Sequence, residues 1–193
     1  MPRHSDAREK MIKSAVRVMR ERGVEAMSFN DVLTRADAPR GSVYHHFPLG
    51  KAQLVREATQ WAGDFMADEE RAAVAGGSLA ALRLLVEYWR RILVGSDFAA
   101  GCPIVAVTVD GAAPPEAREI AGEAFEQWCK IFADTLQDEG VDAARARSLA
   151  TTVIASTEGA VVLCRAERSF EPLEEVAEEL EAMIRGALPN GTR

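Results

Sequence analysis

A short segment from Pro39 to Lys51 carries side chains that could bind a polyanion. Its arginine can donate two hydrogen bonds to the edge of a guanine, and its glycines let a backbone approach DNA closely. A tyrosine and two histidines can donate hydrogen bonds to phosphates. The candidate DNA contacts in and near this segment are Ser28, Arg40, Gly41, Ser42, Tyr44, His45, His46 and Lys51. Of these, His46 is equally compatible with packing inside the segment.

Two helices are predicted ahead of this segment. Apolar residues recur every three or four positions over 6–22, where Asp6 and Glu9 form a candidate capping box. Ser28 is a candidate N-cap for a second helix over 29–36.

A third helix is predicted over 39–47, with Pro39 at its first position, where a missing N–H costs nothing. The second and third helices are joined by a very short turn, which is typical of a helix-turn-helix unit. Its expected inward-facing residues are Val32, Leu33, Val43 and Phe47. The outer face of the third helix would then be available to lie in a DNA groove.

The rest of the chain predicts more helices and no strands, so the fold class is all-α. The expected helices cover 51–75, 78–94, 116–139, 143–168 and 172–188, with a short apolar segment over 102–110. We therefore expect a DNA-binding domain over 1–50 and a ligand-binding and dimerisation domain over 51–193.

Charged residues are unevenly distributed between the beginning of the chain and the rest. Residues 1–55 carry ten Lys or Arg and six Asp or Glu, a balance of +4, whereas residues 56–193 carry thirteen and twenty-four, a balance of −11. Together they give the net charge of −7. A basic end on an acidic body is typical of a protein with one phosphate-binding surface.

The first 50 residues resemble the TetR family of transcriptional regulators. The resemblance lies in SFNDVL at 28–33 and RGSVYHHF at 40–47, with Tyr44 before His46 and Phe47 as its most specific part. GCPI at 101–104 and FPLGK at 47–51 are similar to the LmrA/YxaF-like subgroup.

The resemblance implies DNA contacts at Arg40, Gly41, Tyr44, His45 and Lys51, and repression as the default mode of regulation. Two positions depart from the family pattern. Asp37 stands where the family usually has glycine in the turn, and aspartate enters positive φ more readily than most residues. Pro39 stands where a capping serine is common.

The resemblance also implies a ligand cavity among the later helices, which hold all three tryptophans and most phenylalanines. Flat apolar walls suit a planar, hydrophobic small-molecule effector. The candidate ligand-binding residues are Trp61, Phe65, Trp89, Cys102, Phe125, Trp128, Cys129, Phe132, Thr157 and Glu158. The alternative is that most of these aromatic side chains fill the core.

Alternating three- and four-residue spacing of apolar residues in the last two helices indicates a seam that needs a partner. By resemblance, this hairpin would pair with its copy in a homodimer that binds a palindromic operator. The candidate interface residues are Val153, Ala160, Cys164, Leu173, Val176, Leu180 and Met183. Packing within one chain is the alternative.

Other classes of function are less well supported. The only histidines are His4, His45 and His46, so residues 56–193 contain none for a histidine-dependent catalytic site or a zinc site. We expect no enzyme activity, metal or cofactor, no membrane span and a cytoplasmic protein with reduced cysteines. The alternative function is a non-catalytic DNA-binding or interaction protein without ligand control.

Overall fold

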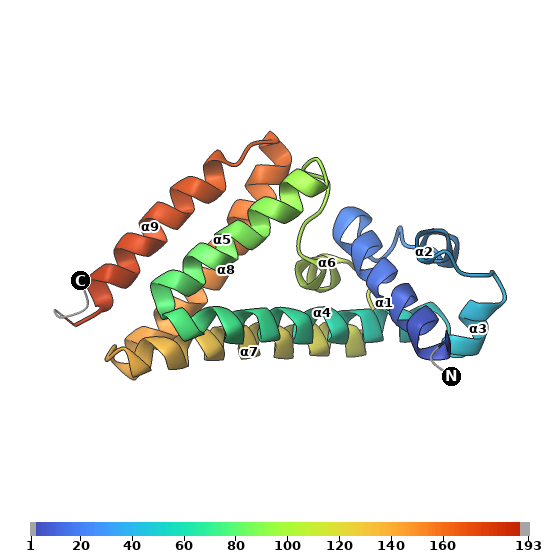
Figure 1. Cartoon of the computed structure of the whole chain (residues 1–193), viewed down its shortest axis with the longest axis horizontal. Helices are drawn as coiled ribbons and strands as arrows, with labels where there is room; N and C mark the ends of the chain where they lie inside the picture. The colour runs from blue at the N-terminus through green and yellow to red at the C-terminus, as the bar shows by residue number, and fades with distance from the viewer. Residues whose placement is uncertain (1–2, 190–193) are drawn as a thin grey trace. The chain divides into compact units, whose positions relative to one another are not determined.

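The computed structural model describes residues 3–189, and this part of the chain is helical and contains no β-strand. The expected all-α fold class is therefore confirmed. The helices are α1 (Arg3–Arg22), α2 (Phe29–Ala36), α3 (Ser42–His46), α4 (Lys51–Ala73), η1 (Val74–Gly76), α5 (Ser78–Gly95), α6 (Pro103–Val109), α7 (Pro115–Asp138), α8 (Ala143–Glu167) and α9 (Glu171–Ala187) (Figure 1).

The chain forms two compact units. Unit 1 comprises Met1–Asp64 and Cys102–Ala124, and unit 2 comprises Phe65–Gly101 and Phe125–Arg193. Helices α4 and α7 each begin in unit 1 and end in unit 2. The predicted functional boundary at residue 50 concerns binding roles and stays a prediction.

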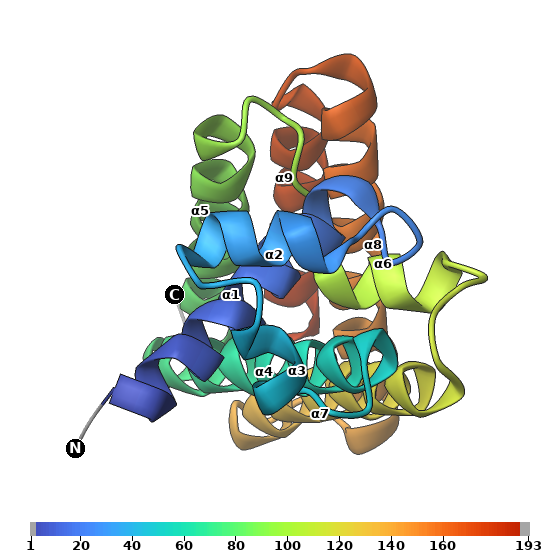
Figure 2. The same ribbon diagram turned by 90° about the vertical axis from the view of Figure 1, so that its right-hand side faces the viewer.

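In unit 1, α1 packs against both α2 and α6 (Figure 2). The buried residues of its core include Met11, Ala15, Met19, Val32, Val43, Phe47, Leu54, Ile104 and Val107. α4 and α7 approach closely here, because a Cβ added to Gly63 would lie 2.9 Å from the Cβ of Ala124. The predicted inward positions Val32, Leu33, Val43 and Phe47 are all buried, as expected.

The first helix is longer than the sequence pattern predicts. α1 begins at Arg3 instead of Asp6, whose side chain lies outside the described ones. No glycine or proline separates Arg3 from Asp6, so nothing in that stretch stops the helix from extending. Its end is as predicted, since Gly23 follows Arg22 with φ of +83°.

α2 has the predicted bounds and cap. The Ser28 hydroxyl accepts a hydrogen bond from the Asp31 N–H at 3.2 Å, and the Asp31 carboxylate accepts one from the Ser28 N–H at 3.1 Å. Asp37 ends the helix in the left-handed region at φ 50° and ψ 49°, as the sequence predicts for a turn position usually held by glycine. The aspartate therefore preserves the sharp turn between α2 and α3.

α3 is shorter than predicted, because it begins at Ser42 and not at Pro39. The Ser42 N–H donates to the Pro39 carbonyl at 3.0 Å, and the Ser42 hydroxyl donates to the same oxygen at 2.6 Å. These bonds close a four-residue β-turn, residues 39–42, ahead of the helix. Arg40 and Gly41 therefore lie in a turn instead of on a helical face.

Unit 2 is built on α5, α8 and α9, which pack against one another. Figure 1 shows α8 and α9 as a hairpin beside α5. The fully buried residues of this core include Leu82, Phe132, Leu136, Leu149, Val153, Leu180 and Ile184. Helix α4 ends at Ala73, and the last predicted residues of that helix form η1 instead.

α8 is apolar on two opposite faces. One face, which includes Leu149, Val153 and Cys164, is buried, whereas Val162 and Leu163 on the other face are 53% and 50% exposed. By length and composition, α8 is the one helix among the described residues that could cross a membrane. The core helix of a globular protein passes the same test, and the buried face of α8 supplies the core of unit 2.

Candidate functional site

The predicted DNA-contacting side chains gather around α3 in unit 1. Tyr44 is 69% exposed, His45 is exposed, and Arg40 and Gly41 are exposed in the turn before the helix. The Tyr44 ring packs edge-on against Phe29 of α2, with ring centroids 5.9 Å apart. This contact holds the Tyr44 ring against α2, while most of the residue stays exposed.

The inner face of α3 is buried in the core of unit 1. Val43 and Phe47 are buried, and the Arg8 guanidinium lies 5.3 Å from the centroid of the Phe47 ring. His46 is half-buried, with its ring 6.4 Å from that of Phe47, so it takes a position between the two predicted alternatives. α3 thus presents one packed face and one exposed face.

Three of the predicted DNA contacts also have roles within the chain. The Ser28 hydroxyl belongs to the α2 cap, and the Ser42 hydroxyl donates to Pro39. The Lys51 ammonium donates to the Glu25 carbonyl at 3.0 Å. An ammonium has three N–H donors, so two of those of Lys51 remain available for a phosphate.

The connection between α1 and α2 is held by a residue far along the chain. The Asp110 carboxylate accepts hydrogen bonds from the N–H groups of Val24 at 2.7 Å and Glu25 at 2.9 Å. Burial acts to raise the pKa of Asp110, but the backbone N–H groups of Glu25, Ala112 and Val24 and the charge of Lys51 together lower it. The carboxylate therefore stays ionised and locks this connection in place.

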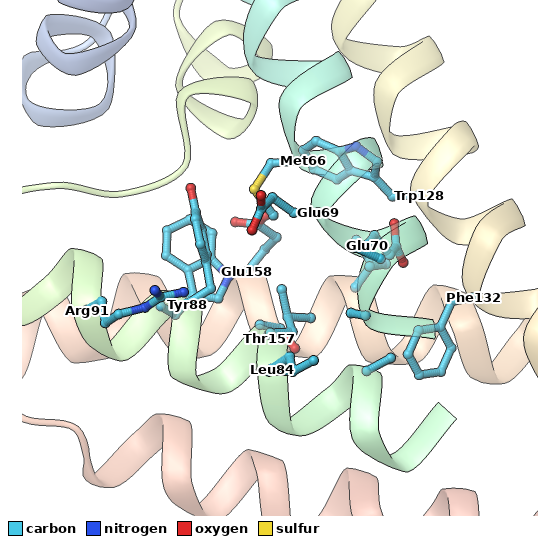
Figure 3. Close-up of a pocket in the computed structure, with 16 residues that line it drawn as sticks. Met66, Glu69, Glu70, Leu84, Tyr88, Arg91, Trp128, Phe132, Thr157 and Glu158 are labelled. Carbon is cyan, nitrogen blue, oxygen red and sulfur yellow. The ribbon is translucent and has the colours of Figure 1, made fainter. Parts of the chain in front are cut away.

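Unit 2 contains a cavity of about 210 Å³ (Figure 3). It lies among the end of α4, α5, the second half of α7, and α8. Five predicted ligand-binding residues line it: Trp89, Trp128, Phe132, Thr157 and Glu158. Flat aromatic walls and a few polar groups are typical of a small-molecule site.

The structure does not bring the other five predicted residues to this cavity: Trp61, Phe65, Cys102, Phe125 and Cys129. Trp61 and Cys102 belong to unit 1, where the Lys13 ammonium lies 5.6 Å from the centroid of the Trp61 ring. Cys102 is buried at the N-cap of α6. Aromatic composition alone could not separate the two cores.

The remaining three residues lie in unit 2 but off the cavity wall. Phe65 is exposed, and Phe125 packs edge-on against Trp128 with ring centroids 5.2 Å apart. Cys129 is half-buried; burial raises the pKa of its thiol, against a hydrogen bond with Thr151 that acts to lower it. These residues are close in sequence to the lining residues Met66 and Trp128, but they do not line the cavity themselves.

Of the charged residues that line the cavity, the sequence pattern predicted Glu158 alone. The lining residues that were not predicted include Met66, Glu69, Glu70, Leu84, Leu85 and Arg91. Met66, Glu69, Glu70 and Ala73 have the spacing of one helical face, which was the available signal. Carboxylates on an acidic helix usually face water, so that signal indicated a solvated surface.

One lining carboxyl group has a strongly altered acidity. Burial raises the pKa of Glu70 to about 8, although the neighbouring Arg71 guanidinium acts to lower it. Among the described residues, the Thr157 hydroxyl has no hydrogen-bond partner, and its side chain is 2% exposed. The cavity wall therefore holds a carboxyl group that is mostly neutral at pH 7 and a hydroxyl able to bond to a ligand.

The predicted dimer residues lie inside the single chain. Five of them are buried within it: Val153, Ala160, Cys164, Leu173 and Leu180. Val176 and Met183 pack against the same core and are partly buried. The apolar seam thus joins α8 and α9 to α5, because heptad-like spacing does not distinguish packing within a chain from packing between chains.

Among the side chains that the structure describes, those of residues 7–189, no group of His, Cys, Asp or Glu has an arrangement that could hold a metal ion. The three cysteines are free thiols, of which Cys102 and Cys164 are buried.

Two family models match the chain. The model of bacterial regulatory proteins of the tetR family matches residues 11–58, and that of the transcriptional regulator LmrA/YxaF-like C-terminal domain matches residues 78–179. The second match alone covers more than half of the chain.

Individual proteins resemble the chain along nearly its whole length. An uncharacterized HTH-type transcriptional regulator of Mycobacterium tuberculosis is 38% identical over 194 residues, covering 96% of this chain and 98% of that protein. The HTH-type transcriptional regulator LmrA of Bacillus subtilis is 29% identical, covering 88% and 92%.

A solved structure has a similar fold. The crystal structure of a TetR regulatory protein from Rhodobacter sphaeroides superimposes with a TM-score of 0.82 at 22% identity, covering 92% of this chain and 98% of that one. With its helix-turn-helix unit in place, the chain belongs to the TetR family of bacterial transcriptional regulators, in the group with an LmrA/YxaF-like C-terminal domain.

Proposed function

We propose that this regulator is a ligand-responsive repressor, which binds a palindromic operator as a homodimer and is released by a small-molecule effector. The observation that carries the proposal is the exposed face of α3, where Tyr44 and His45 project while Val43 and Phe47 are buried. A helix with one face packed against its own core and the other face exposed to solvent is the arrangement that reads a DNA groove.

In the proposed complex, the turn before α3 meets the major groove. Arg40 reads a guanine edge, and Tyr44, His45 and the remaining Lys51 donors bind phosphates. The basic balance of residues 1–55 attracts DNA, whereas the acidic balance of the rest keeps it from other surfaces. We expect the protein to act in the cytoplasm, as regulators of this family generally do.

The outward face of α8 is the proposed contact between two copies. Its exposed residues are Ala155, Gly159, Val162, Leu163 and Ala166. Their spacing places them on one side of the helix, opposite the buried residues. Large exposed aliphatic side chains beside small residues favour close packing of a second helix, and a second α8 related by a two-fold axis would supply it.

Release is proposed to act through α4. This helix carries the lining residues Met66, Glu69 and Glu70 near its end and Lys51 at its start. A ligand that shifts α4 also moves Lys51. The two DNA-binding units of the ligand-bound dimer then lose the spacing that the operator requires. The ligand must therefore prefer the state that does not bind DNA.

Selection from random duplexes at about 0.15 M salt tests operator binding. We expect enrichment of an inverted repeat, with one dimer bound per site. Titration calorimetry then compares the affinity of an effector for the free protein and for the protein bound to operator. Equal affinities would leave DNA binding in place but remove ligand control, in favour of the regulator without an effector.

A further inference from the structure

Building on the proposed ligand control, we infer that the effector is a hydrophobic amine, bound in the unit 2 cavity as its ammonium cation. The inference goes beyond a planar hydrophobic compound, because it assigns the effector a charge. It rests on the combination of charge, aromatic walls and a buried hydroxyl in one cavity.

Charge on the cavity wall is mainly acidic. Glu69 and Glu70 come from α4, Glu158 comes from α8, and Arg91 of α5 is the one cationic side chain in the described lining. In Figure 3, Glu69 and Glu158 lie between Tyr88 and Arg91 on one side and Trp128 on the other. An anionic ligand would meet three carboxyl groups and one guanidinium, so its binding is disfavoured.

The aromatic walls suit a cation. The rings lining the cavity are those of Tyr88, Trp89, Trp128 and Phe132. Their faces carry partial negative charge, which attracts an ammonium group within about 6 Å. A neutral aromatic compound would pack equally well against these rings but would gain no attraction to the acidic side chains of the wall.

The buried hydroxyl of Thr157 supplies a hydrogen-bond acceptor. Its side chain is 2% exposed and lines the cavity, and the oxygen has no hydrogen-bond partner among the described residues. Leaving such a group without a partner is unfavourable, so its presence indicates a ligand with a hydrogen-bonding group, and a hydroxyl oxygen can accept a hydrogen bond from an N–H. An ammonium group has three N–H donors, so it can donate one hydrogen bond to this oxygen and another to a carboxylate.

Glu70 strengthens the case because its acidity responds to charge. Burial raises its pKa to about 8, so it is mostly protonated at pH 7 in the empty cavity. A cation entering the cavity favours its ionised form. The site therefore avoids a permanent buried negative charge when empty and gains one when the amine binds.

The test uses three probes with one aromatic skeleton: 1-naphthylmethylammonium, 1-naphthylmethanol and 1-naphthylacetate. Titration calorimetry of the full chain at pH 7 should give at least tenfold tighter binding of the amine than of the alcohol, and weaker binding of the acetate than of either. An alcohol or acetate that binds as tightly as the amine overturns the inference, as does the absence of amine binding at millimolar concentration.

Variants locate the effect. Glu158→Gln should weaken binding of the amine about tenfold and change that of the alcohol less than twofold. The matched control Glu178→Gln, which removes an exposed carboxylate from α9, should change neither. Equal losses for the amine and the alcohol in Glu158→Gln would overturn the assignment of charge recognition to this cavity.

An operator-release assay separates this inference from the proposed function. Release of DNA by the alcohol with no binding of the amine would retain ligand control and overturn the cationic effector. Binding of the amine in the pocket with no effect on DNA would support the cation site and overturn ligand control through it.

Discussion

Asp110 accepts a hydrogen bond from the Val24 N–H at 2.7 Å across 86 positions of sequence. The same carboxylate oxygen accepts from the Glu25 N–H, and Lys51 donates to the Glu25 carbonyl. One aspartate after α6 and one lysine at the start of α4 thus hold both sides of a single peptide segment between α1 and α2. The position of α1 relative to α2 in the helix-turn-helix unit therefore depends on residues outside that unit.

Replacing Asp110 with asparagine should lower the free energy of unfolding by about 1 kcal/mol at neutral pH, because the charge-assisted bonds from the N–H groups of Val24, Glu25 and Ala112 are weakened. The pKa of this carboxyl is lowered below 3.8, so its contribution is present above that value and disappears as the pH falls through the folded value. Denaturant titration at pH 7 and pH 3 measures both effects. An exposed control, Glu119→Gln on α7, should have little effect at pH 7.

Arg40→Ala should reduce the preference for operator over random DNA by about 1–3 kcal/mol, because a bidentate contact with guanine is lost. Competition binding with specific and scrambled duplexes measures this preference. Arg147→Ala removes an exposed arginine from α8 and should leave the preference unchanged. An unchanged preference in Arg40→Ala would show that another side chain reads the bases.

Glu70→Gln should make the protein more stable relative to the native sequence as the pH rises from about 4.5 to 8. The pKa of Glu70 is raised to about 8 by burial, so its contribution to stability is complete below 4.5 and is lost as the pH rises through 8. Chemical denaturation measures the free energy of unfolding of both proteins at pH 5 and pH 8.5. Between these two pH values, the free energy of unfolding of the native sequence should fall by about 1–3 kcal/mol more than that of Glu70→Gln. If the free energy of unfolding varied with pH in the same way for both proteins, the burial of the Glu70 carboxyl group would be contradicted.

Leu163→Glu should convert the dimer to a monomer, because it places a charge on the outward face of α8. Sedimentation velocity at micromolar concentration measures the change, and operator affinity should fall with it. Val109→Glu is the matched control, since Val109 is 77% exposed and lies at the end of α6 in unit 1. A dimer that survives Leu163→Glu would place the contact on another surface.

Gly63→Ala should lower the free energy of unfolding by about 1–3 kcal/mol, because the new Cβ would lie 2.9 Å from that of Ala124 and force α4 and α7 apart. Gly122→Ala is the control on α7, where a Cβ meets nothing within 4 Å. It should be neutral or stabilising by less than about 1 kcal/mol, as alanine favours helix. Thermal unfolding of both variants distinguishes crowding from helix propensity.

Local chemistry made much of unit 1 predictable. The Ser28 cap, the α2 bounds and the left-handed Asp37 each depend on neighbours within a few residues, so sequence spacing predicted them correctly. The start of α3 was not predictable in this way. Pro39 is compatible with a first helical position, but the Ser42 hydrogen bonds close a turn there instead.

The sequence did not show which helices pack together when they are far apart along the chain, and most of the differences from the predicted site arise from this. Trp61 and Trp128 have the same side chain on similar helices, yet one lies in unit 1 and the other lines the cavity. Likewise, the spacing of Leu173 and Leu180 showed that they need a partner helix but could not show that it belongs to the same chain. Glu70 was overlooked because a helical carboxylate usually faces water.

Under the proposed function, the two faces of α8 have separate roles, one in ligand binding and the other in pairing. Thr157 and Glu158 line the cavity, while Val162 and Leu163 lie on the exposed side of the same helix. Under the proposed pairing, mutations in the outward strip could therefore prevent mixed pairs with related regulators in one cell while leaving the recognised compound unchanged. A gene duplicate could acquire a separate circuit through substitutions at a few surface positions.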